Sequence, residues 1–334
     1  MIAAFLAVGC DGPEKPTPTP DAPAIACPAN VTMRGVPGGP QPVTYTPPTV
    51  TGGAPPVNVT CTPGSGTMFS VGTTAVGCTA VDTLSRQAQC SFTVTLTPLL
   101  LSVTKFVAFG DSFTEGEDGR TARLGFGFGF IDPTGTYPVL LQTRLNNEYP
   151  GQSIVVENRG KSGEPIDDGR QRLPGELATY RPGALLLLDG YNDLLGSCGD
   201  RDPTAASSIE CATAISNVVV GYRKMIQIAR SAGVNYVFAS TLTPPGRYIS
   251  GTYRRIADSA IRQTNTKLAP VVAAEGATLV DAYPVFIGHE EDYVADDGLH
   301  LRRAGYQALA DTFFLAIKST VSSTPAFGGT LHTQ

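Results

Sequence analysis

The stretch KFVAFGDSFTEGEDG, residues 105–119, decides which fold and which chemistry the sequence can support. It begins with an apolar run, as in a buried strand, and Gly-Asp-Ser at 110–112 ends that run abruptly. In a parallel α/β sheet, ligands bind in the crevice outside the carboxyl ends of the strands. Ser112 at such a position is either a helix N-cap or a nucleophile, since Ser and Asp are both ordinary N-caps. The rest of the chain has to decide between the two.

Strand-like and helix-like segments alternate between residues 102 and 322. Amphipathic segments such as YPVLLQTRLNNEY separate the apolar runs, and this alternation is typical of βαβ units and a parallel sheet. ALLLL at 184–188 is apolar without alternation, as expected of a strand that helices cover on both faces. We therefore predict an α/β domain, a three-layer α/β/α sandwich, whose five parallel strands are Lys105–Phe109, Ser153–Glu157, Ala184–Leu188, Val234–Ala239 and Thr278–Val280.

Residues 24–98 have a different texture. Short runs rich in β-branched residues, among them PVTYTPPTV and CSFTVTL, recur between turns that contain Pro and Gly. This pattern predicts a small antiparallel all-β sandwich. The segment contains no histidine and its acids are scattered, so we expect no site of chemistry in it.

Charge and hydropathy exclude several function classes. The 334 residues are enough for two domains, and 24 basic against 29 acidic side chains give a net charge of −5. A negative chain has no electrostatic attraction for nucleic acid, so no nucleic-acid partner is expected. The sequence also lacks an apolar run long enough to span a membrane.

The N-terminus and the cysteines indicate export. MIAAFLAVGC, residues 1–10, resembles the end of a bacterial lipoprotein signal with Cys10 as the lipid acceptor; a plain secretory signal is the alternative. Residues 11–23 are rich in Pro and Thr and predict an extended tether, and residues 323–334 a flexible tail. Six further cysteines, an even set without a metal-type Cys-x-x-Cys pair, predict disulfides and an oxidising compartment: Cys27, Cys61, Cys78, Cys90, Cys198 and Cys211.

Polar groups follow the predicted strands at the edge where a ligand would bind. NRGKSGE follows the second strand, DGYND the third, and ADDGLH precedes the last helix. Of the three histidines, His332 lies in the tail and His289 among acids, whereas His300 follows Asp297 by three residues. That spacing lets a carboxylate turn back onto the imidazole Nδ1, and an activated serine requires such an oriented base.

These blocks resemble those of the SGNH, or GDSL-type, hydrolases. FGDSFTEG with Ser112, VENRGKSGE, DGYND with Asn192, and DDGLH with Asp297 and His300 occur in the family's order over roughly residues 104–321. The resemblance implies a flavodoxin-like hydrolase fold and an ester-cleaving serine, with Ser112, Asp297 and His300 as the catalytic residues. The second block implies Gly163 as an oxyanion glycine, with Gly160 as the alternative.

The mechanism that this resemblance implies has a clear physical logic. Ser112 attacks an ester carbonyl while His300 takes its proton and Asp297 orients His300. The backbone N–H groups of Ser112 and Gly163 and the side-chain amide of Asn192 hold the oxyanion. No cofactor and no metal is expected.

Two competing assignments need weighing. Asp296 adjoins Asp297 and could orient the histidine instead, although one more residue separates it from His300. A metal site built from His289, Glu290, Asp296 and His300 is conceivable but lacks any recognised ligand spacing.

Two features near the predicted crevice concern the substrate. RLGFGFGFIDPTGTYP alternates Phe126, Phe128 and Phe130 with glycine, and could form either a packed loop or an apolar wall for an acyl chain. Tyr191 beside Asn192 is a further candidate substrate contact. Cys198 and Cys211 are expected to close a disulfide in the loop after Asn192.

The N-terminal segment resembles the hyalin repeat, an immunoglobulin-like module. IACPANV, VTCTP, FSVGTTAVGCTAVD and CSFTVTL carry the resemblance, whereas DTLSRQAQC departs from the family's usual Gly-Asn turn. Four cysteines allow three connectivities, and Cys27–Cys90 with Cys61–Cys78 is one working guess. Contact with glycans or a cell surface through this module is conceivable.

The sequence thus predicts a secreted or surface-anchored serine esterase acting on small-molecule, lipid or glycan esters. Two alternatives stay open. One is a carbohydrate O-acetylesterase or an acyltransferase that uses the same acyl-enzyme. The other is an adhesion or glycan-binding protein with a vestigial hydrolase. Membrane contact is expected only through a lipid on Cys10.

Overall fold

The computed structural model describes residues 18–36, 38–119, 130–199, 208–246 and 256–323. The chain divides into two compact units, Met1–Thr97 and Pro98–Gln334. The predicted all-β module falls in the first unit and the predicted α/β domain in the second. No helix in these ranges is long and apolar enough to cross a membrane.

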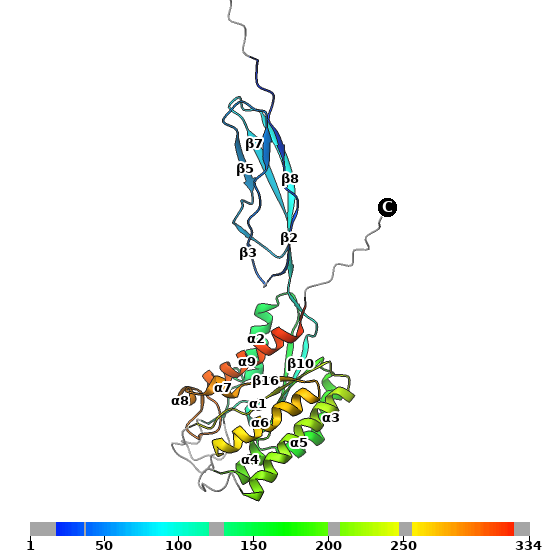
Figure 1. Ribbon diagram of the computed structural model, residues 1–334, viewed down its shortest axis with the longest axis vertical. Helices are drawn as coiled ribbons and strands as arrows, with labels where there is room; N and C mark the ends of the chain where they lie inside the picture. Colours follow the sequence, from blue (N-terminus) through cyan, green and yellow to red (C-terminus); the bar gives the residue numbers. More distant parts are fainter. Residues whose placement is uncertain (1–17, 37, 120–129, 200–207, 247–255, 324–334) are drawn as a thin grey trace, which may run out of the picture. The chain divides into compact units, whose positions relative to one another are not determined.

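The first unit is built from short strands around a small core (Figure 1). Its largest sheet has the order β2 (Val31–Val36), β8 (Gln87–Pro98), β7 (Gly72–Val81) and β5 (Asn58–Thr62). Alternate residues of β7 and β8 point inward, as a sheet with one solvated face requires. The pairs β1 (Ala24–Ala26) with β4 (Thr49–Thr51), and β3 (Gln41–Pro42) with β6 (Met68–Phe69), complete it. The buried core residues are Val36, Val43, Tyr45, Phe69, Val76, Cys78, Phe92, Val94 and Leu96.

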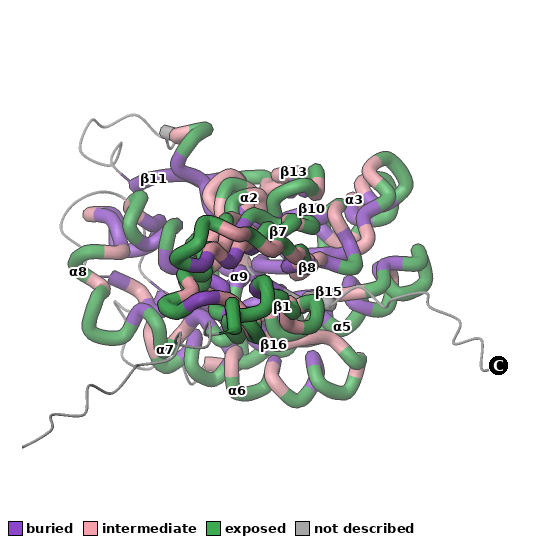
Figure 2. The backbone as a smooth tube through the Cα atoms, turned by 90° about the horizontal axis from the view of Figure 1, so that it is seen from above, coloured by how far each residue is buried: buried purple, intermediate pink, exposed green. Residues whose placement is uncertain are grey.

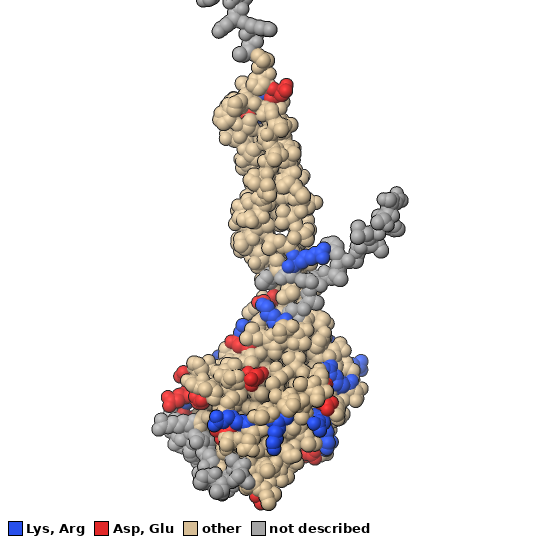
Figure 3. Space-filling model, in the orientation of Figure 1, with Lys and Arg blue, Asp and Glu red and all other residues tan. Residues whose placement is uncertain are grey.

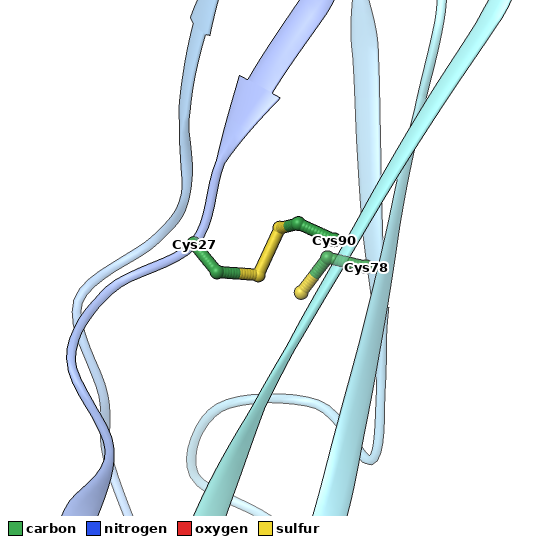
Figure 4. A group of neighbouring side chains, drawn as sticks. All are labelled: Cys27, Cys78 and Cys90. Atoms are coloured by element: carbon green, nitrogen blue, oxygen red, sulfur yellow. A yellow bond between two sulfur atoms is a disulfide. The ribbon is translucent and has the colours of Figure 1, made fainter.

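Two disulfides join the strands of this unit. Cys27 pairs with Cys90, and Cys61 with Cys78, so the guessed connectivity is the one that the structure forms. Figure 4 shows the Cys27–Cys90 bond with the Cys78 sulfur beside it. Cys78 lies directly opposite both Cys61 and Cys90 in the antiparallel ladder, which explains why these sulfurs gather.

The turn at Asp82, which departs from the hyalin-repeat pattern, is held by a side chain. The Asp82 carboxylate accepts backbone N–H groups from Ala54, Leu84 and Arg86. The Asp82 side chain thus stabilises this turn by hydrogen bonds to its backbone, where the hyalin-repeat pattern has a Gly-Asn turn. Figure 3 shows few charged side chains on the drawn face of this unit.

The second unit is the predicted three-layer α/β/α sandwich. Its five parallel strands have the order β13 (Val155–Gly160), β10 (Lys105–Gly110), β14 (Ala184–Leu188), β15 (Tyr236–Ser240) and β16 (Thr278–Val280). This 2-1-3-4-5 order in chain sequence is the flavodoxin-like order, and it confirms the predicted fold class. Every residue of β14 is buried, as its unbroken apolar run predicts. Figure 2 colours the buried stretches of the chain purple.

Helices cover the sheet on both faces (Figure 1). Helices α2 (Tyr137–Glu148) and α9 (Arg303–Val321) pack against each other on one face. Helices α3 (Ile166–Tyr180), α5 (Ile209–Ser231) and α6 (Asp258–Ala274) cover the other. The shorter elements are β9 (Leu100–Leu101), α1 (Ser112–Glu115), β11 (Glu117–Asp118), β12 (Phe130–Ile131), α4 (Tyr191–Ser197), α7 (Tyr283–Phe286), α8 (Glu290–Tyr293) and β17 (Ser322–Ser323).

The predicted strands are present, with shifted ends. The second begins at Val155 rather than at Ser153 and runs on to Gly160. The cause is Asn146 of α2, whose side chain bonds both the N–H and the C=O of Ile154. A residue whose backbone groups are bonded in this way is withheld from the ladder with β10.

Candidate active site

The turn that follows β10 places Ser112 at the start of a short helix. Gly110 has φ 154°, and a Cβ there would lie 1.7 Å from the Leu188 carbonyl oxygen, so only glycine fits. Asp111 is the N-cap of α1, and its Oδ1 accepts the Phe113 N–H at 3.1 Å. The capping role in Gly-Asp-Ser thus belongs to Asp111. Ser112 has its hydroxyl free for another purpose.

Ser112, His300 and Asp297 form a continuous chain of hydrogen-bond distances. His300 Nε2 is 2.9 Å from Ser112 Oγ, and His300 Nδ1 is 2.7 Å from Asp297 Oδ2. Asp297 Oδ1 accepts the backbone N–H groups of Leu299 and His300, which fixes the carboxylate in its tight loop. All three catalytic candidates are at most 5% exposed.

The surroundings of His300 and Asp297 favour the charged form of both side chains. Burial alone lowers the pKa of His300, but the hydrogen bond and the charge of Asp297, helped by Glu117 and Asp111, raise it above its ordinary value. Burial likewise opposes ionisation of Asp297, and the bond to His300 outweighs it, so the pKa of Asp297 is lowered. The site is therefore suited to hold an imidazolium next to a carboxylate.

The structure gives other contacts to Asp296, the alternative orienting acid, and to His289, a member of the conceivable metal site. Asp296 Oδ1 lies 2.7 Å from Arg302 Nη2, so Asp296 pairs with an arginine while Asp297 faces the imidazole. His289 stacks on Tyr293 with ring centroids 5.1 Å apart. Across the described ranges, the one cluster of at least three ligand-type side chains consists of Cys27, Cys78 and Cys90. Their sulfurs are in disulfides.

The loop after β13 has one backbone N–H, that of Gly163, without an acceptor in the described part of the chain. The N–H of Lys161 donates to the Gly110 carbonyl, that of Ser162 to Glu115 Oε2 at 2.6 Å, and that of Glu164 to the Lys161 carbonyl. Among the residues that the structure describes, none accepts the Gly163 N–H, and its φ of 74° suits glycine.

Gly160, the alternative oxyanion glycine, serves packing. Its N–H donates to Asn158 Oδ1, and a Cβ there would lie 2.0 Å from the backbone nitrogen of Glu115. The residue allows β13 to approach α1 closely. Asn192, the third proposed donor, uses its side-chain Nδ2 to donate to the Glu164 carbonyl at 3.1 Å, so this amide points at the Gly163 loop.

Beneath the serine lies a layer of buried polar groups. Asp111 Oδ2 accepts the Tyr191 N–H, and burial raises the pKa of Asp111 to about 7. Asp189 Oδ1 accepts the Gly190 N–H, whereas its Oδ2 is buried with no partner in the described part of the chain. Burial also raises the pKa of Asp189, with the charge of Asp111 adding to the effect. Burial therefore makes Asp111 and Asp189 weaker acids than exposed aspartates.

The predicted substrate contacts are only partly described. Tyr191 is 2% exposed and stacks on Phe113 with ring centroids 3.7 Å apart, which leaves little of its ring open to a ligand. Phe126 and Phe128 lie outside the described residues, and Phe130 begins β12. The disulfide Cys198–Cys211 links the end of α4 to the start of α5.

The sequence analysis did not identify three residues of this site. Glu115 holds the Gly163 loop through Ser162, and Glu117 Oε2 lies 3.6 Å from His300 Nε2. Gly119 packs so closely that a Cβ would lie 2.5 Å from Asp297 Oδ2. All three stand in the opening stretch, but their roles depend on contacts with distant parts of the chain.

Several solved structures are similar to part of this chain. They include a lipase/acylhydrolase from Enterococcus faecalis, with 21% identity, coverage of 65% of this chain and 96% of that one, and a TM-score of 0.47. A putative arylesterase from Agrobacterium tumefaciens has 20% identity, 65% and 99% coverage and a TM-score of 0.49. An acetylxylan esterase mutant from Geobacillus stearothermophilus has 18% identity, 65% and 95% coverage and a TM-score of 0.48. No curated protein matches the chain.

Family models match both units. The model of the HYR domain matches residues 19–96, in the first unit. The model of the GDSL-like lipase/acylhydrolase family matches residues 108–308, which contain Ser112, Asp297 and His300 and make up more than half of the chain. The chain belongs to the GDSL-like lipase/acylhydrolase family.

Proposed function

We propose that this protein is a serine esterase that hydrolyses carboxylic esters through an acyl-enzyme on Ser112. Family membership supports an ester-hydrolysing enzyme at the coarser level. The observation that carries the finer proposal is the Ser112–His300–Asp297 chain, with contacts of 2.9 and 2.7 Å. A nucleophile, a base and a group that orients the base are the parts that such a reaction needs.

The proposed reaction uses each group in turn. Ser112 Oγ attacks the ester carbonyl as His300 Nε2 takes its proton, and the ionised Asp297 stabilises the imidazolium that forms. The tetrahedral intermediate collapses, the C–O bond to the alcohol breaks, and His300 returns the proton to the leaving oxygen. Water, deprotonated by the same histidine, then releases the acid and restores Ser112.

Three donors are proposed to hold the oxyanion. Ser112 is the first residue of α1, so its N–H has no acceptor within the helix. The N–H of Gly163 has no acceptor among the described residues, and Asn192 turns its amide toward the same loop. Loss of one such donor typically lowers kcat by about 10²–10³.

The setting is proposed to be extracellular. The three disulfides and the HYR domain suggest an extracellular protein. Lipid attachment at Cys10 remains a proposal, since Cys10 lies outside the described residues. We also propose residues 24–98 as the β module, 102–322 as the hydrolase domain, and 11–23 as its tether.

Hydrolysis of p-nitrophenyl esters from acetyl to palmitoyl, by wild type and by Ser112→Ala, tests the proposal. Activity should fall in the variant, by up to about 10⁶ in kcat. The preferred chain length then separates an acetylesterase from a lipase-like enzyme. Equal activity in both proteins would show that Ser112 is not the nucleophile.

A further inference from the structure

The carboxylate of Glu117 lies beside Ser112 and His300, and within the described ranges its nearest charged partner is His300. Its Oε2 is 3.6 Å from His300 Nε2, the same nitrogen that contacts Ser112 Oγ. The Glu117 side chain is 11% exposed, and no residue in the ranges that the structure describes donates a hydrogen bond to it. A carboxylate largely removed from water is costly unless it is paired. The exposed remainder therefore marks where a donor from a ligand could reach it.

The fold fixes the position of this carboxylate. Gly116 ends α1 in the left-handed region, with φ 100°, and a Cβ there would lie 2.1 Å from Thr136 Cγ2. Glu117 then pairs with Ile131 in the β11–β12 ladder, and its carbonyl accepts the Tyr306 hydroxyl at 2.6 Å. Because these contacts hold the backbone of Glu117 on both sides, the fold keeps its carboxylate in place next to His300.

The proposed mechanism brings the leaving group close to the Glu117 carboxylate. In the proposed mechanism, His300 Nε2 gives its proton to the oxygen of the departing alcohol, so that oxygen must come close to Nε2. Glu117 is then within reach of a substituent on the neighbouring carbon of that alcohol. A hydroxyl at that carbon can donate to the carboxylate, and hydrogen bonds to a charged acceptor are the stronger kind.

We propose that Glu117 determines specificity by binding a hydroxyl next to the scissile ester, and that the preferred substrates are esters of polyhydroxylated alcohols. This inference rests on the proposed esterase function. A neutral donor fits better than a cation, because His300 itself becomes positive during the reaction and a fixed ammonium group beside it would oppose that change. An anionic group at the same place would be repelled by Glu117.

Two matched esters test the inference. 2-Hydroxyethyl acetate carries the donor, whereas 2-methoxyethyl acetate keeps the oxygen and lacks the O–H. Wild type should prefer the hydroxy ester by roughly tenfold or more in kcat/KM. Glu117→Ala should bring the ratio close to one, and Glu117→Gln, whose amide oxygen still accepts, should keep an intermediate ratio. Asp292→Ala, which removes one exposed carboxylate from α8, should keep the wild-type ratio.

Several results would overturn the inference. A wild type without preference would do so, and so would a Glu117→Ala enzyme that slows both esters equally, since Glu117 would then act only on His300. Selective loss of a choline ester in that variant would show that the site takes a cation instead. If wild type hydrolyses neither ester nor any p-nitrophenyl ester faster than Ser112→Ala, the proposed function itself fails.

Discussion

Replacement of Asp297 by asparagine should nearly abolish activity without disturbing the fold. The Asp297 carboxylate accepts three hydrogen bonds. Oδ1 takes the N–H groups of Leu299 and His300 at 2.9 and 3.0 Å, and Oδ2 faces His300 Nδ1 at 2.7 Å. An asparagine has one acceptor oxygen and one amino group, so it cannot serve both sides in the same way. The local geometry decides which orientation it takes.

The two backbone bonds should determine that orientation. If the amino group faced the two N–H donors, two hydrogen bonds would be lost at about 1–3 kcal/mol each, or about 2–6 kcal/mol in total. The amide oxygen of the substituted side chain should therefore stay on the backbone, and its amino group should donate to Nδ1. His300 then carries its proton on Nε2 and cannot accept the proton of Ser112. The same substitution in serine proteases lowers kcat about 10⁴-fold by this route.

The assay is kcat with the best p-nitrophenyl ester, alongside circular dichroism to verify folding. Asp296→Asn is the matched control, because Asp296 pairs with Arg302 and does not face the imidazole. The control should stay within tenfold of wild type. If Asp297→Asn also stayed within tenfold, or if both variants fell equally, the assignment of Asp297 as the orienting group would be refuted.

Three further predictions concern neighbouring groups. Since the pKa of His300 is raised above its ordinary 6.5, the rise of kcat/KM with pH should have its midpoint above 6.5, and Glu117→Gln should move that midpoint to lower pH. A wild-type midpoint at or below 6.5 would contradict the raised pKa of His300. Asp189→Asn should increase the free energy of unfolding by roughly 1–3 kcal/mol at pH 8 and by less at pH 4, because an acid whose pKa is raised by folding destabilises the folded state as pH rises. Urea titrations at both pH values measure the two differences, and a larger gain at pH 4 than at pH 8 would contradict the raised pKa of Asp189. Gly119→Ala should lower kcat about a hundredfold by displacing Asp297, with the fold retained, and wild-type kcat would show that the contact is not critical.

The sheet and the contact between Asp297 and His300 could be predicted because their signals are local. An unbroken apolar run as short as residues 184–188 is typical of a strand covered on both faces, and the structure shows it fully buried. Asp297 and His300 are three residues apart, so their contact needs nothing but a tight loop. The order of polar strand ends then placed Ser112 in the same crevice, because parallel strands share one carboxyl edge.

Glu117 could not be predicted for the opposite reason. Its contact with His300 joins residues far apart in the chain and depends on the left-handed turn at Gly116 and on the pairing of β11 with β12. Strands of two residues, such as β11 and β12, are too short to produce a recognisable periodicity in the sequence. Tyr191 illustrates the same limit, since its position beside Asn192 suggested a substrate contact, whereas stacking on Phe113 buries its ring.

Two carboxylates explain why the opening stretch carries acids around its serine. Asp111 accepts the N–H of Phe113, next to Ser112, and that of Tyr191, next to Asn192. Glu115 accepts the N–H of Ser162, next to Gly163. Each of the three proposed oxyanion donors therefore has a neighbour tied to α1 by a carboxylate. Donors held in advance need no rearrangement when charge develops on the substrate, and this is the condition under which they accelerate a reaction most. The acids of GDSFTE thus act through the backbone, and they would be needed even if neither ever exchanged a proton.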